Sequence, residues 1–372
     1  MSYLVKKLDN AHIVWFQASN QWVQFDEPQW LIFSFYVKGT ELNEAANKFA
    51  KKYSTSQSEA AQLVGSFYKS LGKLFNPDFD IPDFSVDSNL VKLYQPLRTR
   101  KRYYSFKNKA FSIVYGSPSL EKYIHLPIKN LETKGVTTGQ CFEVFIHGSK
   151  HFLKVGEQSP KYFAAQDSGQ LKRLLYIEMA NFFYEKKTND WLAFIHGSAV
   201  KMNDEVLILT SEGGSGKSTM AGLLLKHGFE LFSDDFIPVD SVSPKVFPFP
   251  ASLCVKNDAI SMLKEQGFTL FEPAKSNLAY VVQHRGSEPT KPCKKLKVVF
   301  IKYNSNVDFQ LNPISTLEAL YHFFQEGWVG NDLKRARKFI SWFSKLEFYR
   351  LEFGNNSKAI QALTDLVGKH EK

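Results

Sequence analysis

The chain has 372 residues, of which 44% are apolar, 15% aromatic and 23% charged. This length is more than twice that of a typical domain of about 150 residues, so we expect two or three domains with sizeable apolar cores. Three widely spaced cysteines give no support for a disulfide framework or a cysteine zinc site. No apolar run reaches the roughly 18–20 residues of a membrane span, and the first residues lack a signal-peptide pattern. We therefore expect a cytoplasmic protein with no membrane partner.

The formal net charge is +10. Such a charge suits nucleic acid, an anionic membrane or an acidic ligand, and it also arises from a lysine-rich soluble surface. Arginine, which nucleic-acid-binding proteins favour for phosphate and base contacts, occurs only eight times. The one dense basic cluster comprises Arg98, Arg100, Lys101 and Arg102. We interpret it as a solvated linker and predict no nucleic-acid partner.

Residues 1–95 are predicted to form a small α+β domain. Residues 12–25 alternate apolar and polar side chains around a turn at residues 18–20, which predicts a β-hairpin. Residues 29–37 are apolar on one face and end before Gly39. Gly39 and Thr40 are expected to stop this segment and to cap the helix that follows.

Two helical patterns complete this domain. The first opens at residues 40–43 and the second at Ser56 or Ser58, and a linker is predicted at residues 76–83. The hairpin-plus-helices pattern over residues 8–75 resembles the PqqD-like fold, a winged-helix unit that holds the leader segment of modified precursor peptides. An ordinary helical N-terminal domain without a ligand fits the same pattern equally well.

The next part of the chain is predicted to be rich in strands. Residues 103–165 carry apolar segments separated by Gly, Ser and Pro turns. His147 and His151 are four residues apart, which could hold a metal on a helix, but Gly148 between them favours a hairpin turn. We assign them no metal. Residues 171–187 have the pattern of an amphipathic helix.

The strongest functional motif is a glycine-rich loop that follows two predicted strands and precedes a predicted helix. Strands are predicted at residues 192–195 and 205–210, a glycine-rich loop follows from Ser211, and a helix is predicted over residues 220–225. Strand, glycine-rich loop, G-K-S-T and helix occur in the order that a P-loop requires. The residues expected to bind the nucleotide are Gly213, Gly214, Ser215, Gly216, Lys217, Ser218 and Thr219.

The residue types of this loop suit a nucleotide phosphate. Glycines let backbone N–H groups converge on phosphate oxygens, and the helix N-terminus adds partial positive charge. Lys217 supplies a full positive charge for the β- and γ-phosphates, and Ser218 offers a hydroxyl to Mg²⁺. The usual first glycine is replaced by Ser211, a position that serves loop geometry more than charge. We predict an ATP and Mg²⁺ site; a purely structural loop is the alternative.

An acidic pair follows the next predicted strand. Residues 230–232 are apolar and strand-like, and they lead into Asp234 and Asp235. Carboxylates at the end of a strand beside a phosphate loop can hold Mg²⁺ and accept a proton from an attacking hydroxyl. A solvated turn is the alternative interpretation.

These motifs together resemble the HPr kinase/phosphorylase catalytic domain, and more closely the wider set of HPr-kinase-related proteins. The likeness spans residues 105–367 and is sharp only over residues 196–235. It implies a P-loop catalytic domain over residues 96–372, in an α/β chain that is α+β overall. It also implies that Asp234 is the general base and that Asp235 supports Mg²⁺. His196 would position the phosphate loop or sense protonation, although a core histidine satisfied by backbone fits as well.

Two departures from the family put HPr itself in doubt as the substrate. The glycine-rich segment with which true HPr kinases recognise or dephosphorylate HPr is not evident after Asp235, and Ala251 stands where an arginine is often found. Phosphorylase activity is in doubt for the same reasons. Lys256 and Arg285 are candidates for the missing phosphate contacts, or are surface residues.

The sequence thus predicts a kinase that transfers the γ-phosphoryl group of ATP to a serine-type hydroxyl. If the N-terminal domain is PqqD-like, the acceptor is a ribosomally made precursor peptide or small protein whose leader that domain binds. A kinase for free serine or another metabolite and a catalytically silent, nucleotide-gated peptide-binding protein are the alternatives. A homo-oligomer is a possible assembly, with no number specified.

Overall fold

The computed structural model is a mixed α/β protein made of two compact units. Unit 1 comprises Met1–Ile81, Thr316–Phe324 and Val329–Ser344, and unit 2 comprises Pro82–Ser315, Gln325–Trp328 and Lys345–Lys372. The structure describes residues 2–77, 100–135, 139–148, 150–164, 168–211, 214–273, 277–282 and 291–368. The expected domain boundary at residue 95 and most of the expected linker lie outside these residues.

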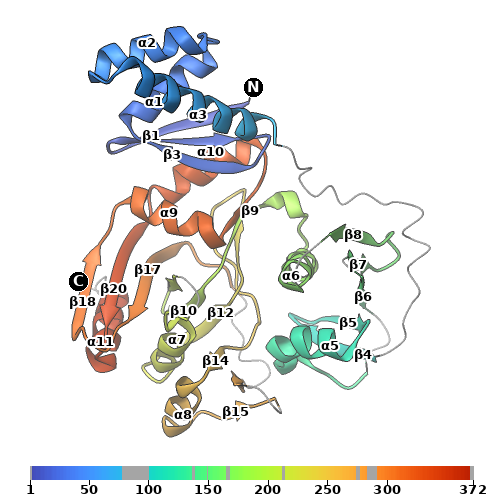
Figure 1. The fold of residues 1–372 in the computed structure, drawn as a ribbon. Helices are drawn as coiled ribbons and strands as arrows, with labels where there is room; N and C mark the ends of the chain where they lie inside the picture. Colours follow the sequence, from blue (N-terminus) through green and yellow to red (C-terminus); the bar gives the residue numbers. More distant parts are fainter. Residues whose placement is uncertain are drawn as a thin grey trace. The chain divides into compact units, whose positions relative to one another are not determined.

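Unit 1 begins with a three-stranded antiparallel sheet followed by three helices (Figure 1). The predicted hairpin is confirmed, because β2 pairs with β3 in antiparallel register. Strand β1, which the alternation did not predict, pairs with the other edge of β2. The elements are β1 (Tyr3–Leu8), β2 (Ala11–Phe16), β3 (Gln21–Phe25), α1 (Glu27–Val37), α2 (Leu42–Tyr53) and α3 (Gln57–Phe75).

The capping residues explain where these helices begin. Ser56 caps α3 in a reciprocal pair with Glu59, which confirms one of the two predicted starts. Thr40 does not cap α2: its backbone N–H donates to the carbonyl of Phe35, so Thr40 still closes the end of α1. Glu41 takes the N-cap position of α2 without a side-chain hydrogen bond.

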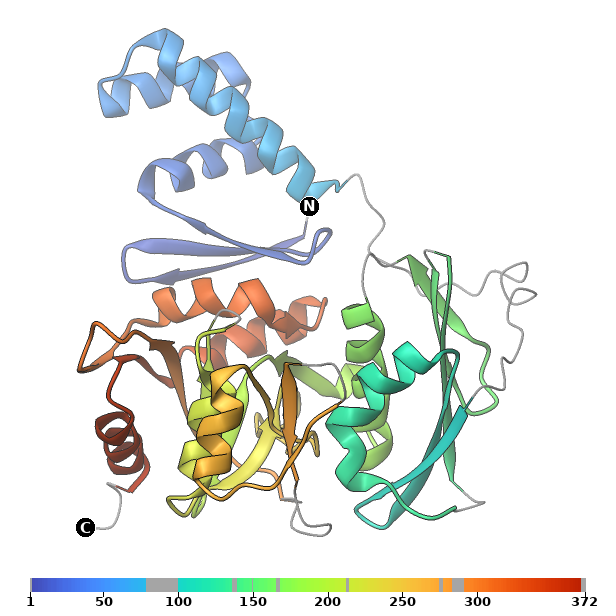
Figure 2. The same ribbon diagram turned by 60° about the horizontal axis from the view of Figure 1, so that its bottom comes forward.

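The small sheet of unit 1 is covered on both faces. One face packs against α1 and α3 in a cluster of large rings that includes Phe16, Phe33 and Phe75. On the other face Trp22 stacks on Phe324 of α9 (Thr316–Glu326) with 5.0 Å between the ring centroids. Trp22 also contacts Phe339 of α10 (Leu333–Phe343). Figures 1 and 2 show these two late helices, in orange, beside the blue N-terminal sheet. Unit 1 therefore includes segments that the sequence placed in the other domain.

Unit 2 contains a six-stranded sheet with the strand order β12–β10–β11–β17–β20–β18. The three strands β11, β17 and β20 run parallel, and the outer pairings are antiparallel. The helices α7 and α11 join the core on this sheet, together with α8. The bounds are β10 (Ser198–Met202), β11 (Glu205–Thr210), α7 (Lys217–Leu225), β12 (Glu230–Asp234), α8 (Asp258–Glu265), β17 (Lys295–Tyr303), β18 (Phe309–Pro313), β20 (Glu347–Phe353) and α11 (Asn356–Gly368).

A second, five-stranded sheet of unit 2 has the order β4–β5–β6–β7–β8. The predicted hairpin around Gly148 is confirmed by the antiparallel pairing of β6 and β7. The strand-like region also contains a helix, α5, that the sequence did not predict. The bounds are β4 (Arg100–Phe106), β5 (Lys109–Tyr115), α5 (Pro118–His125), the 3-10 helix η1 (Leu126–Leu131), β6 (Gln140–His147), β7 (Lys150–Val155), β8 (Lys161–Ala164) and α6 (Ser168–Tyr184).

The basic cluster near residue 100 is not a solvated linker where the structure describes it. Arg100 and Arg102 lie on β4, and both form ion pairs with the buried carboxylate of Glu121 on α5. The linker interpretation is wrong for these residues because they belong to a paired strand and share a carboxylate from a helix that was not predicted, although Arg100 keeps 61% of its side chain exposed.

Shorter elements complete the fold. Strands β9 and β13 pair in antiparallel register, and β14, β16 and β15 form a small antiparallel sheet. No helix within the described ranges is long and apolar enough to span a bilayer. The bounds are η2 (Thr188–Asp190), β9 (Trp191–Ile195), β13 (Ile237–Asp240), β14 (Cys254–Lys256), β15 (Leu270–Phe271), β16 (Leu278–Val281) and β19 (Trp328–Val329).

Candidate active site

The glycine-rich segment forms a loop between the buried strand β11 and the helix α7, as the sequence predicts. Gly214 and Gly216 have φ values of +83° and +97°, in the left-handed region that residues with a Cβ rarely adopt. The helix begins at Lys217, three residues before the predicted start, so Lys217, Ser218 and Thr219 form its first turn. Gly213 lies outside the described residues.

The donors of this loop fit an anion. Gly216 stands at the N-cap of α7 and makes no side-chain hydrogen bond to the helix, so the N-terminus of α7 brings its partial positive charge to the loop. Lys217 Nζ donates to the carbonyl oxygen of Ser211 over 2.7 Å, which folds the cation back over the loop. The hydroxyl of Ser215 is buried and has no hydrogen-bond partner within the described part of the chain. A buried donor of this kind is costly unless a ligand satisfies it.

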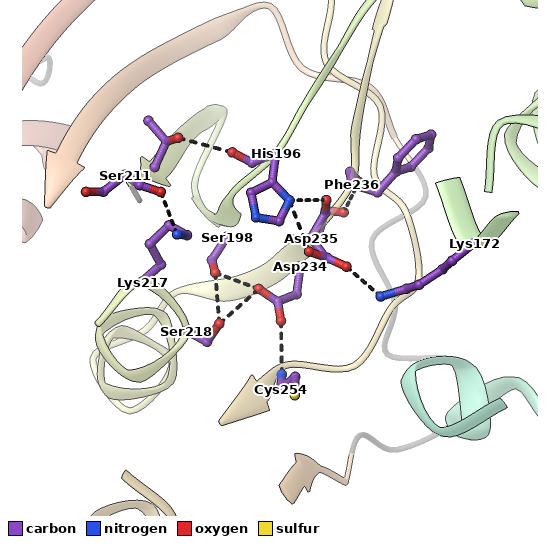
Figure 3. A network of polar contacts seen from close by, with 12 residues as sticks. Lys172, His196, Ser198, Ser211, Lys217, Ser218, Asp234, Asp235, Phe236 and Cys254 are labelled. Atoms are coloured by element: carbon purple, nitrogen blue, oxygen red, sulfur yellow. Dashed lines mark hydrogen bonds and ion pairs between the residues drawn. The ribbon is translucent and has the colours of Figure 1, made fainter. Parts of the chain in front are cut away.

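Asp234 ends β12 and is surrounded by donors from three different elements (Figure 3). Its Oδ1 accepts hydrogen bonds from the hydroxyls of Ser198, at 2.5 Å, and Ser218, at 3.3 Å. Its Oδ2 accepts the backbone N–H of Cys254 at 2.9 Å. The residue is only 4% exposed, and this burial raises the pKa of its carboxyl to about 6 in spite of the hydrogen bonds.

Asp235 turns away from Ser218. Its φ is +71°, a left-handed conformation that is uncommon for any residue except glycine. Its Oδ1 lies 3.0 Å from His196 Nδ1, and its Oδ2 accepts from Lys172 Nζ at 2.6 Å. Burial acts to raise the pKa of this carboxyl, but the hydrogen bond from His196 and the charge of Lys172 together hold it well below the usual range.

His196 contacts Asp235 of the acidic pair. Its Nδ1 is within hydrogen-bond distance of both the carboxylate and the backbone oxygen of Asp235. Because both partners are acceptors, Nδ1 carries a hydrogen. The link from His196 to the sheet runs through its backbone carbonyl, which accepts the hydroxyl of Thr210 at 3.1 Å.

Lys172 is a site residue that the sequence analysis missed. It comes from α6, and its side chain is 15% exposed. Its Nζ lies 5.4 Å from the ring centre of Tyr123 and 5.3 Å from that of Tyr176. Lysine stems often lie against apolar surface with the charge in water, so a lysine on a helix attracts no attention in a sequence. The available signal was its spacing of three and four residues from the buried Leu175 and Tyr176, which places a charge on the apolar face.

The structure brings together some of the predicted residues and separates others. Ser218 and Asp234 meet, and they present oxygen atoms of the kind that Mg²⁺ prefers. Asp235, expected beside Mg²⁺, binds His196 and Lys172 instead. Among the described residues there is no group of three or more His, Cys, Asp and Glu side chains suited to a metal ion. Lys256 is exposed on β14, and Arg285 lies outside the described residues.

Comparison with protein-family models and with curated proteins finds no match. The function is therefore inferred from the residues of the site and their contacts.

Proposed function

We propose that this protein is a Mg²⁺- and ATP-dependent kinase whose P-loop catalytic domain resembles that of HPr-kinase-related proteins. One observation carries the proposal: the Ser218 hydroxyl and the Asp234 carboxylate meet at the first turn of α7, directly after a loop with left-handed glycines. A hydroxyl and a carboxylate on adjacent strand and helix ends form the oxygen pair that holds Mg²⁺ beside a phosphate chain.

The loop residues have defined tasks in this proposal. Lys217 would exchange the Ser211 carbonyl for phosphate oxygens, because a full negative charge is the better partner for its ammonium group. The buried Ser215 hydroxyl and the uncapped N–H groups of α7 would donate to the same phosphates. Mg-ATP supplies the phosphoryl group that is transferred, and the protein supplies position and charge.

We further propose that the acceptor is a serine-type hydroxyl on a ribosomally made precursor peptide or small protein. The N-terminal part of unit 1 supports this proposal by its order of elements, a β-hairpin followed by helices, on which the resemblance to PqqD-like leader-binding units rests. The net charge of +10 would favour an acidic leader.

Mass spectrometry of candidate acceptors incubated with the protein and Mg-ATP tests the function. Serine-containing precursor-like peptides and free serine are compared side by side, with the Asp234→Asn variant as the control. A phosphoryl gain on a peptide that the variant does not produce supports the proposal. A gain on free serine alone makes the protein a metabolite kinase. No gain on either, with ATP still bound, favours a silent nucleotide-binding protein.

The role of the leader is best tested by truncating the peptide, not the protein. Deleting residues 1–95 would strip Phe324 and Phe339 of their ring contacts with Trp22, so lost activity could reflect damage to α9 and α10. Steady-state kinetics with the full precursor and with its core segment alone avoid this problem. We expect KM to rise when the leader is removed, and an unchanged KM would contradict leader binding.

A further inference from the structure

The two adjacent carboxylates differ in what surrounds them. Both oxygens of Asp234 are engaged by donors from Ser198, Ser218 and Cys254, and only 4% of the residue is exposed. Asp235 keeps 40% of its side chain exposed, although each of its oxygens has a cationic or N–H partner. An incoming hydroxyl can therefore approach Asp235 much more readily than Asp234.

We propose that the two carboxylates divide the kinase reaction between them, with Asp234 on the Mg²⁺ side and Asp235 on the acceptor side. This inference rests on the proposed kinase function and reverses the roles that the family resemblance implies. A general base must be able to reach the proton that it takes, so geometry is weighed before basicity. Asp234 instead shares its Oδ1 with the serine that is expected to bind Mg²⁺.

The backbone between the two residues produces this division. Asp234 is the last residue of β12, and the left-handed φ of Asp235 turns the chain sharply toward β13. The backbone N–H of Asp235 donates to the carbonyl of Gly197 at 2.9 Å. The strained conformation is thus held by the residues that precede β10, next to His196, and not by β12 itself. Backbone strain of this kind commonly occurs at functional sites.

Lys172 and His196 act as positioning residues for Asp235. Lys172 reaches the carboxylate from α6, and the rings of Tyr123 and Tyr176 flank its ammonium group. His196 approaches the other oxygen (Figure 3). Two contacts from different elements fix both the place and the rotation of the carboxylate, which a single ion pair would leave free to rotate.

The chemical step balances with these groups. The acceptor oxygen forms a bond to the γ-phosphorus of ATP as the bond from that phosphorus to the β–γ bridging oxygen breaks. ADP leaves with the electron pair of the broken bond, and the hydroxyl proton passes to a carboxylate oxygen of Asp235. Lys172 stays on the other oxygen and balances the charge of the carboxylate before the transfer.

The test compares Asp234→Asn with Asp235→Asn in the full-length chain. Calorimetry gives the Mg²⁺ concentration at half-maximal ATP binding, and ADP release gives turnover with water as the acceptor. For Asp234→Asn we expect that Mg²⁺ concentration to rise about tenfold or more. For Asp235→Asn we expect it to change less than about twofold while turnover falls about a hundredfold. Asparagine is chosen at residue 235 because it tolerates left-handed φ.

Two variants of Lys172 test whether this residue positions Asp235 or only stabilises the fold. Lys172→Met should lower turnover without changing ATP binding, and Lys172→Arg should restore part of it because the cation is retained. Arg173→Met, at the exposed neighbouring position of α6, is the matched control and should leave turnover unchanged.

The outcomes distinguish this inference from the proposed function. If Asp235→Asn raises the Mg²⁺ requirement as much as Asp234→Asn does, or turns over at the wild-type rate, the division of roles is wrong. If ATP hydrolysis is too slow to follow, the Mg²⁺ requirement of the two variants alone decides whether the division of roles holds. If the wild-type chain binds no ATP in the presence of Mg²⁺, the kinase proposal itself fails.

Discussion

Two polar networks of unit 2 differ in ways that bear on function. The first joins Lys172, His196, Asp234, Asp235 and Ser218. The second lies by the five-stranded sheet, where Arg102 on β4 donates to Glu121 and to Glu132, and Arg100 also pairs with Glu121. We call them the carboxylate network and the arginine network.

The arginine network is complete in itself. The Tyr104 hydroxyl lies 2.6 Å from that of Tyr115 and 2.9 Å from His125 Nδ1, and His125 Nε2 lies 3.8 Å from Glu132. The opposite charges face each other on regular strands and helices, without a left-handed residue among these members. Burial lowers the pKa of His125 to about 4, so this histidine is neutral inside the fold near pH 7.

The carboxylate network is incomplete by comparison. It adjoins a buried serine hydroxyl that has no partner among the described residues, and it includes a left-handed aspartate. Its buried carboxylate, Asp234, has a pKa raised to about 6. Unsatisfied buried groups, backbone strain and shifted pKa values are features that cluster at functional sites. The difference teaches that a buried polar cluster points to function when its groups are unsatisfied or strained, not merely when they are charged.

The largest expected effect is a loss of phosphoryl transfer without a loss of stability. Lys217→Ala should reduce phosphoryl transfer by at least about a hundredfold, because a preorganised charge on the phosphates is lost. Its unfolding midpoint should stay close to that of the wild type, because Lys217 bonds to a backbone carbonyl at the surface of the loop. Lys226→Ala, at the other end of α7, is the matched control and should retain transfer. Transfer by Lys217→Ala at the wild-type rate would remove the distinction between the two networks.

The next effect is on stability alone. Glu121→Gln should lower the free energy of unfolding by about 1–2 kcal/mol, because Arg100 and Arg102 lose the charge of their shared buried partner while Arg102 keeps Glu132. Denaturant titration measures this loss. ATP affinity of the folded variant should equal that of the wild type, and a large drop in affinity would show that the arginine network also serves the site.

A pH titration probes the same network through His125. Its pKa is about 4 when folded and near 6.5 when unfolded, so the unfolded chain binds more protons between these values. The free energy of unfolding should therefore fall by about 2 kcal/mol as the pH drops from 6.5 to 5. His125→Gln, measured by the same denaturant titrations, should flatten this slope. An equal slope in both proteins would contradict the assignment.

The smallest expected effect is a gain in thermal stability. Asp234→Asn removes a carboxylate whose pKa burial raises, and its amide can rotate to accept from Cys254 and donate to both serines. We expect the unfolding midpoint to rise by about 2–4 °C while transfer is lost. Differential scanning calorimetry measures the shift. A clear drop in the midpoint would mean that Asp234 stabilises the fold, as the members of the arginine network do.

The parts of the site that depend on local chemistry could be predicted from the sequence. Gly214 and Gly216 permit the left-handed backbone of the loop, and Ser218 and Asp234 lie at the ends of regular elements. The direction of Asp235 could not be predicted, because the residues that hold it come from the loop before β10 and from α6. In the fold, helix α5 has only eight residues, and its start signals, the cap Ser117 and the following Pro118, were available in the sequence, whereas strand β1 lacks apolar–polar alternation.

The assignment of α9 and α10 to unit 1 has a consequence for how the chain is made. A ribosome delivers residues in order, and Trp22 emerges about three hundred residues before Phe324 and Phe339, the rings that cover it. Until then one face of the N-terminal sheet lacks its apolar cover. The N-terminal sheet therefore belongs to a unit that is completed only after residues 316–344 have been made, and a nascent chain halted before residue 316 should expose that face to chaperones.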